Sequence, residues 1–296
     1  MLGLNVRAMT SENNTGSDKG ERIAKLLARA GIASRREAER MIEAGRIALH
    51  GKKLSTPATL LPNLEGVSVD GEPITEARPT TQLWRFHKPK GVITTHHDPQ
   101  GRKTVFDLLP ADAGRLISVG RLDLNSEGLL LITNDGELAR YLEHPSTGLT
   151  RRYRVRVHGK VNVAKLQSLK DGITIEGVRY GSIDAELERQ QGTNAWLNVA
   201  LNEGKNREIR KVFAALELPV TRLIRISYGP FNLGPLKKGD MQSIRSADWG
   251  KVARPIIERL KLDAPLAPKR KKKGWAKSKP AQTKKGGPMR SAKRRQ

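Results

Sequence analysis

A polar loop between two short apolar segments constrains the fold of this chain more than any other feature of its sequence. Residues 116–119 (LISV) and 129–133 (LLLIT) predict two strands, and the second is apolar enough to be buried on both faces. The loop between them, GRLDLNSEG (120–128), is polar, and a loop held by a rigid frame is a common place for functional groups. Residues 134–136 (NDG) then predict a turn leading into a helix that starts near Glu137.

The region from Leu83 onward has short strand and helix signals without a βαβ rhythm, which indicates an α+β domain. The segment RYRVRV (152–157) alternates, so Tyr153 shares one strand face with two valines while three arginines share the other. Residues 206–218 have helical periodicity, and Arg210 flanks the apolar stripe. Since neither a G-x-G-x-x-G nor a Walker motif occurs, a nucleotide-binding loop is unsupported.

A smaller domain is predicted near the N-terminus, with two short helices followed by a small sheet. The apolar spacing in residues 21–30 predicts the first helix, which Gly31 ends. Ser34 and Glu37 have the spacing of a capping box at the start of the second helix, which stops at Gly45. Strands are expected at 47–49, 52–54 and 67–69.

Arg35 and Arg36 fall in the first turn of this second helix. The helix dipole disfavours cations there and favours anions, so a purely structural design would place acids at these positions. Two arginines beside free backbone amides form a phosphate site instead. The structural alternative is a solvated basic face.

The charge of the chain points to a polyanionic partner. The sequence has 55 Lys and Arg against 30 Asp and Glu, a net charge of +25. Residues 264–296 hold 13 of the basic residues and no acid, and their composition predicts disorder. This tail is either a solubiliser or, as we favour, a phosphate-binding arm.

Composition also excludes several classes of protein. The chain lacks cysteine, an apolar run of membrane-spanning length and a secretory signal, so we expect a cytoplasmic protein. The polar leader 1–19 is expected to be disordered, and Met9 is a plausible alternative start to Met1. His96, His97 and Asp98 lie together without convincing further metal ligands, so we interpret them as a loop, with an RNA contact as the functional alternative.

Four segments resemble one family of enzymes. RIAKLLARAGIASRREAERMIEAGRI (22–47) resembles the alpha-L RNA-binding domain. The segments GRLDLNSEGLLLITNDGELA (120–139), TRRYRVRVHG (150–159) and EGKNREIRKVFAALELPVTRLIRISYGPF (203–231) resemble, in order, three motifs of the RsuA/RluB family of ribosomal RNA pseudouridine synthases. The overall sequence and the basic tail are most similar to the branch of the family that acts on the large ribosomal subunit.

The resemblance implies a mostly antiparallel mixed sheet with a central cleft, behind the RNA-binding domain. It also implies the isomerisation of a uridine in RNA to its C-glycoside, after the target nucleotide flips out of its helix. No metal or other cofactor is implied. The expected partner is 23S ribosomal RNA or a pre-ribosomal particle, bound by a monomer. The implied domains are a leader (1–19), the RNA-binding domain with its linker (20–80), the catalytic domain (81–253) and a basic tail (254–296).

The resemblance also assigns roles to single residues. Asp123 becomes the essential carboxylate, and attack at C1′, attack at C6 and a glycal route all stay open. Arg121 fills the space left by the flipped base, and Tyr153 stacks on the uracil. Arg210 pairs with Asp123, because a desolvated carboxylate takes up a proton unless a cation holds it ionised. In the alpha-L domain, Arg35, Arg36 and Arg40 face the RNA.

Each role has an alternative. For Arg121 the alternative is a simple contact with phosphate. An aromatic residue in a strand, such as Tyr153, usually belongs to the core. For Arg210 the alternative is a surface arginine at the edge of its helix. The whole chain could be a non-catalytic RNA-binding or ribosome-assembly protein, or a sibling enzyme that acts on 16S ribosomal RNA. A pure binder has no need of the trio Asp123, Tyr153 and Arg210, which favours the enzyme.

Overall fold

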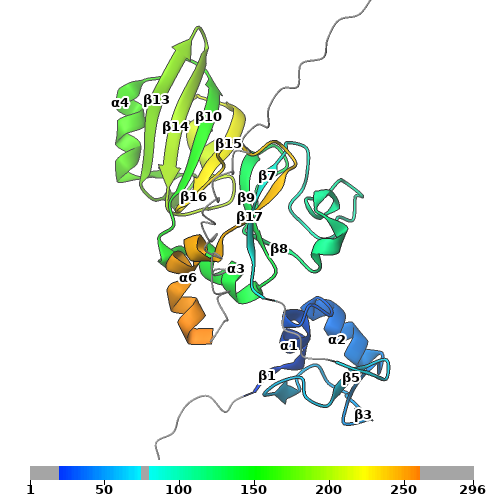
Figure 1. The fold of residues 1–296 in the computed structure, drawn as a ribbon. Helices are drawn as coiled ribbons and strands as arrows, with labels where there is room; N and C mark the ends of the chain where they lie inside the picture. The colour runs from blue at the N-terminus through cyan, green and yellow to red at the C-terminus, as the bar shows by residue number, and fades with distance from the viewer. Residues whose placement is uncertain (1–19, 75–79, 261–296) are drawn as a thin grey trace, which may run out of the picture.

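A computed structural model of the chain describes residues 20–74 and 80–260, which form two domains (Figure 1). The first contains β1 (Glu21–Arg22), α1 (Ile23–Arg29), α2 (Arg35–Glu43), β2 (Ile47–Leu49), β3 (Lys52–Lys53), β4 (Leu60–Leu61), β5 (Val67–Val69) and β6 (Glu72–Pro73). The strands β3, β2, β5 and β6 form one sheet in that order, and β1 pairs with β4. The predicted helix pair and small sheet are confirmed.

Local signals explain the helix ends in this domain. The backbone amide of Glu37 donates to Ser34 Oγ (3.1 Å), so Ser34 caps α2 as predicted. The other half of the capping box differs, because the Glu37 carboxylate pairs with Arg40 instead. Helix α1 begins at Ile23, two residues later than predicted, since β1 pairs with β4.

The second domain is built on a nine-stranded sheet with helices against it. Its elements are β7 (Leu83–Lys88), β8 (Ile117–Val119), β9 (Glu127–Thr133), α3 (Gly136–Glu143), β10 (Arg151–His158), α4 (Val163–Gln167), β11 (Ile173–Ile175), β12 (Val178–Tyr180), β13 (Ile183–Gln191), β14 (Asn194–Leu201), α5 (Glu208–Ala215), β15 (Val220–Tyr228), β16 (Phe231–Asn232), β17 (Met241–Ile244) and α6 (Ser246–Leu260). Short 3₁₀ turns occur at Phe106–Leu108, Ala111–Ala113, Pro145–Thr147 and Ser168–Asp171.

The main sheet runs β13-β14-β10-β15-β9-β7-β17, with β16 paired to β15 and β8 to β9. Every pairing in this sheet is antiparallel except that of β9 with β15, so the predicted mixed, mostly antiparallel sheet is confirmed. Strand β9 is buried along its whole length, as its apolar run predicted. Its residues alternate between two hydrophobic cores, one packed against α4 and α5 and the other against α3 and α6.

The parallel joint between β9 and β15 depends on Gly128. Its φ is +108°, and a Cβ built there would lie 2.3 Å from the carbonyl oxygen of Arg225. Only glycine therefore allows β15 to approach this closely. Beside the joint, Glu127 pairs with Arg222 (2.5 Å) and Lys238 (2.8 Å). Burial raises the pKa of Glu127, but the hydrogen bonds and charges of these two cations outweigh it and lower the pKa to about 2.

The end of the second domain differs from the expected boundary at residue 253. Helix α6 continues to Leu260, and Ile256 is buried against the second core. The apolar residues of α6 hold it on the domain. The leader 1–19 and residues 261–296 of the tail lie outside the described residues. None of the helices in the described ranges has the length and apolar character needed to cross a membrane.

Candidate active site

A cavity of about 820 Å³ lies where the polar loop 120–126 faces the sheet and the start of α5. The loop enters β9 at the parallel joint, so the junction of the two halves of the sheet positions it. Four side chains that the sequence singled out line this cavity together: Arg121, Asp123, Tyr153 and Arg210. They come from the loop, from β10 and from α5, which are distant in sequence.

Asp123 lies in a hydrogen-bonded turn, since the amide of Ser126 donates to its carbonyl (3.0 Å). Its side chain is 36% exposed, so it is reachable from the cavity. One of its carboxylate oxygens lies 3.7 Å from Nη1 of Arg207. A carboxylate held beside a cation at the wall of a cavity is suited to act on a bound substrate as a base or nucleophile.

The ion pair of Asp123 differs from the predicted one. Helical periodicity placed Arg210 toward Asp123 and Arg207 away from the apolar stripe. In the structure α5 begins only at Glu208, and Arg207 precedes it with a left-handed backbone (φ +52°). Arg207 therefore leaves the helical phase, and its side chain reaches the carboxylate.

Arg210 binds the backbone of the loop that carries Asp123. Its guanidinium donates to the carbonyl of Asn125 (2.9 Å) and to that of Val220 (3.2 Å). Burial lowers the pKa of Arg210, Arg207 lowers it further, and the charge of Asp123 raises it. Arg210 thus contributes positive charge near Asp123 without forming the predicted ion pair.

Tyr153 is 9% exposed and belongs to the same core as Val155 and Val157, with the arginines on the opposite face of β10. The predicted alternation is confirmed. The ring also lines the cavity, so the core location and the cleft location hold together. Stacking on a uracil stays a prediction.

Lys88 is a site residue that sequence reasoning missed. Its side chain is fully buried, and Nζ donates to the carbonyls of Pro89 (3.1 Å), Asp123 (3.1 Å) and Ser126 (2.9 Å). Burial lowers its pKa to about 8, while the charges of Asp123 and Glu127 oppose this shift. A signal was present, because alternation in β7 places Lys88 on the buried face with Phe86.

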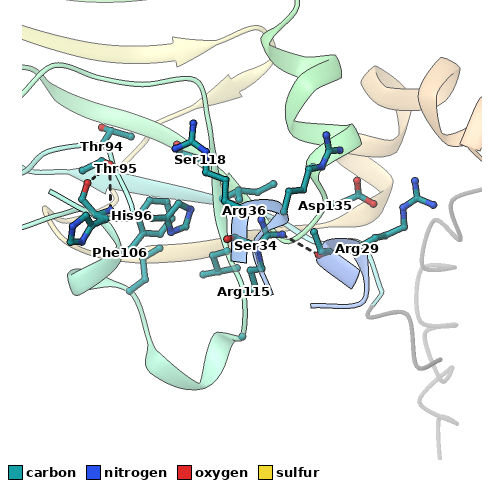
Figure 2. Close-up of a pocket in the computed structure, with 18 of the residues that line it drawn as sticks. Arg29, Ser34, Arg36, Thr94, Thr95, His96, Phe106, Arg115, Ser118 and Asp135 are labelled. Carbon is teal, nitrogen blue, oxygen red and sulfur yellow. Dashed lines mark hydrogen bonds between the residues drawn. The ribbon is translucent and has the colours of Figure 1, made fainter. Parts of the chain in front are cut away.

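A second, larger cavity of about 2000 Å³ lies between the two domains (Figure 2). Arg35, Arg36 and Arg40 of α2 line it and are all exposed to solvent. The two cavities adjoin each other, because five residues line both of them: Thr94, Thr95, His97, Pro99 and Arg121. We call the larger cavity the interdomain groove.

Three contacts beside the groove hold the domains together. Glu137 at the start of α3 pairs with Lys25 of α1 (2.8 Å) and lies 3.9 Å from Arg35. Arg115 of the second domain donates to the carbonyl of Ala28 in α1 (3.0 Å). These contacts fix the position of the two domains on either side of the groove.

The loop containing His96, His97 and Asp98 lies between the groove and the active-site cavity. Asp98 is bound by Arg102 (2.7 Å), and His96 stacks on Phe106. In residues 20–74 and 80–260, acidic and histidine side chains form no cluster of three or more that could hold a metal ion.

Comparisons with known proteins agree with this arrangement. Residues 82–215 match the family model of RNA pseudouridylate synthase, and residues 21–62 match that of the S4 domain. An uncharacterised RNA pseudouridine synthase of Rickettsia conorii is 45% identical over 225 residues, which cover 76% of this chain and 96% of the relative. Ribosomal large subunit pseudouridine synthase B of Escherichia coli O6:H1 is also 45% identical, over 74% of this chain and 76% of that protein.

A crystal structure of a pseudouridylate synthase has the same fold, with a TM-score of 0.55 at 24% identity over 78% of this chain and 99% of that one. The S4 match covers the N-terminal helix pair, and the synthase match covers the loop with Asp123, strand β10 and helix α5. Fold, site and relatives lead to one conclusion: the chain belongs to the RsuA/RluB family of RNA pseudouridine synthases, isomerases that here carry an S4 RNA-binding domain in front of the catalytic domain.

Proposed function

We propose that this enzyme converts one uridine of 23S ribosomal RNA to pseudouridine, with Asp123 as the essential carboxylate. The observation that carries the proposal is the position of Asp123 in a cavity that is also lined by Tyr153 and by five arginines, Arg121, Arg207 and Arg210 among them. The large-subunit RNA is favoured because a relative named for that subunit is 45% identical over three quarters of its length. The proposal includes a monomer acting in the cytoplasm.

The target nucleotide must leave its helix to reach Asp123, at a cost of a few kcal/mol. In the proposal, Arg121 occupies the space that the base leaves, and one face of Tyr153 stacks on the uracil. Arg207 lies 3.7 Å from the carboxylate of Asp123, and Arg210 donates to the carbonyl of Asn125 in the same loop. The N1–C1′ bond then breaks, the uracil rotates, and C5 bonds to C1′; C5 then loses its proton and N1 gains one, so the product is an isomer of the substrate.

The RNA around the target is proposed to lie in the interdomain groove. Arg35 and Arg36, in the first turn of α2, are exposed and line the groove, which suits them to phosphate. Arg40 is the weaker contributor, because its charge is paired with Glu37. Because the groove and the active-site cavity share lining residues, we propose that one RNA strand contacts both.

The test is a map of pseudouridine in ribosomal RNA from cells with and without this protein. We expect one position in 23S RNA to lose its pseudouridine and to regain it when the normal protein is returned. Asp123→Asn should fail to restore it while binding RNA nearly as well, because the side chain is nearly isosteric. Loss of a position in 16S RNA would transfer the proposal to the small subunit, and full restoration by Asp123→Asn would refute the role of the carboxylate.

A further inference from the structure

An exposed aromatic stack lies in the interdomain groove, outside the active-site cavity. The rings of His96 and Phe106 are stacked, with centroids 3.6 Å apart and planes 13° from parallel (Figure 2). Both residues line the groove. The other three phenylalanines of the chain, Phe86, Phe213 and Phe231, are buried. Phe106 is partly buried and packs against the core beside α4 and α5, while His96 is exposed, so core packing accounts for Phe106 but not for His96.

The loop that carries His96 is braced at its base. Asp98 accepts hydrogen bonds from the backbone amide (2.9 Å) and the guanidinium of Arg102, and its carboxylate is nearly inaccessible. Thr95 Oγ1 donates to the carbonyl of His97 (2.8 Å). His96 therefore projects from a rigid turn, and less side-chain entropy is lost when a ligand binds it.

This loop also forms hydrogen bonds with the loop that carries Asp123. Thr94 Oγ1 donates to the carbonyl of Leu122 (2.9 Å), the residue before Asp123, and the amide of Gly91 donates to the carbonyl of Leu124 (2.9 Å). The stack is therefore held at a fixed position relative to the carboxylate. The groove that holds the stack shares lining residues with the cavity of Asp123, so a ligand on the stack would lie in the space adjoining that cavity.

The surroundings of the stack suit a nucleobase joined to a phosphate backbone. Burial and the nearby charge of Arg115 lower the pKa of His96, which favours the neutral imidazole. A neutral ring stacks on a base and keeps one nitrogen as a hydrogen-bond acceptor. Arg36 and Arg115 line the same groove and can meet phosphates.

We propose that His96, supported by Phe106, is a second base-binding site, which stacks an unpaired nucleobase of the substrate RNA beside the flipped uridine. Aromatic side chains, including histidine, bind bases of single-stranded RNA in this way. The site would hold the RNA in register while the target occupies the cavity. The inference rests on the proposed function only in requiring RNA as the substrate, and it does not depend on which uridine is modified.

The test measures how tightly the full-length protein binds two oligonucleotides of equal charge. One is a 12-mer of adenosine, and the other is a 12-mer of abasic ribose phosphates. Stacking contributes about 1–3 kcal/mol per base, so His96→Ala should weaken binding of the adenosine 12-mer by about 5- to 150-fold. Binding of the abasic 12-mer should not change. His96→Phe keeps the stack and should retain most of the affinity for adenosine.

His158→Ala is the matched control, because it removes an exposed imidazole from the far end of β10, and it should change neither affinity. If His96→Ala weakens both oligonucleotides equally, or neither, the base-binding site is refuted. Pseudouridine mapping is read separately. If the protein modifies 23S RNA but His96→Ala has no base-dependent effect, the proposed function stands and the base-binding site is refuted. If His96→Ala has the base-dependent effect but 23S RNA is not modified, the base-binding site stands and the proposed target is refuted.

Discussion

The two arginines near Asp123 have different surroundings, which predicts different mutant phenotypes. Arg210→Ala removes the donor from the carbonyl of Asn125 and so loosens the loop that carries Asp123. Since displacement of a catalytic group by about 1 Å can cost 10²-fold, we expect a loss of turnover of that order. Arg207→Ala breaks a half-exposed ion pair worth about 0–1 kcal/mol, so the loss should be about fivefold or less.

Single-turnover rates on the mapped RNA measure this difference, with Lys211→Ala as the control, since Lys211 is exposed on the same helix. A larger defect in Arg207→Ala than in Arg210→Ala would mean that the direct ion pair matters more than the position of the loop.

Lys88 should make the stability of the fold depend on pH at the alkaline end. Its pKa is about 8 in the folded protein and 10.5 in the unfolded chain, so between these values the unfolded chain binds more protons. The free energy of unfolding should therefore increase as the pH rises from 8 to 10.5, and this increase should be absent below pH 8. Lys88→Met should lack this rise.

At pH 7, Lys88→Met should also destabilise the protein by about 1–3 kcal/mol, because three carbonyls lose their donor. Urea unfolding at several pH values measures both effects, and the exposed Lys90→Met serves as the control. An identical pH profile for Lys88→Met and the unmodified chain would show that Lys88 is not the titrating group.

At the scale of elements, the joint of β9 and β15 is where the two halves of the sheet meet, and Gly128 is its most restrictive position. Gly128→Ala places a methyl group against the backbone of Arg225 at a strained φ, so we expect a loss of about 2–5 kcal/mol of stability. Gly136→Ala is the control, since its Cβ would make only ordinary contact with Ile117. Equal thermal unfolding temperatures for both variants would contradict this account of the joint.

At the scale of the whole molecule, the segment 264–296 contributes a large share of the positive charge of the chain. Deleting residues 264–296 removes 13 positive charges, and each one that contacts phosphate contributes about 0.7–0.9 to the log–log dependence of affinity on salt. We expect the shortened chain to bind ribosomal RNA more weakly and with a shallower salt dependence. Its active site should be unaffected at saturating RNA. An unchanged slope across a salt titration would make the tail a solubiliser.

Features set by neighbouring residues were determined by the sequence alone. The Ser34 cap, the buried strand 129–133, the alternation around Tyr153 and the loop of Asp123 all depend on side chains within a few positions of each other. The family resemblance added the order of the two domains, and it predicts the role of Asp123.

Tertiary structure decided the contacts that join distant segments. The left-handed backbone at Arg207, which no periodicity encodes, transfers the ion pair from Arg210 to Arg207. Lys88 becomes a buried clamp only because β7 packs beside β9 and brings it under a loop 35 residues away. The stack of His96 on Phe106 likewise depends on the pairing of Ile93 with the segment 103–105, which brings the two rings together. Burial and charge pairing depend on what packs around a residue, and for these residues the neighbours in space are not the neighbours in sequence.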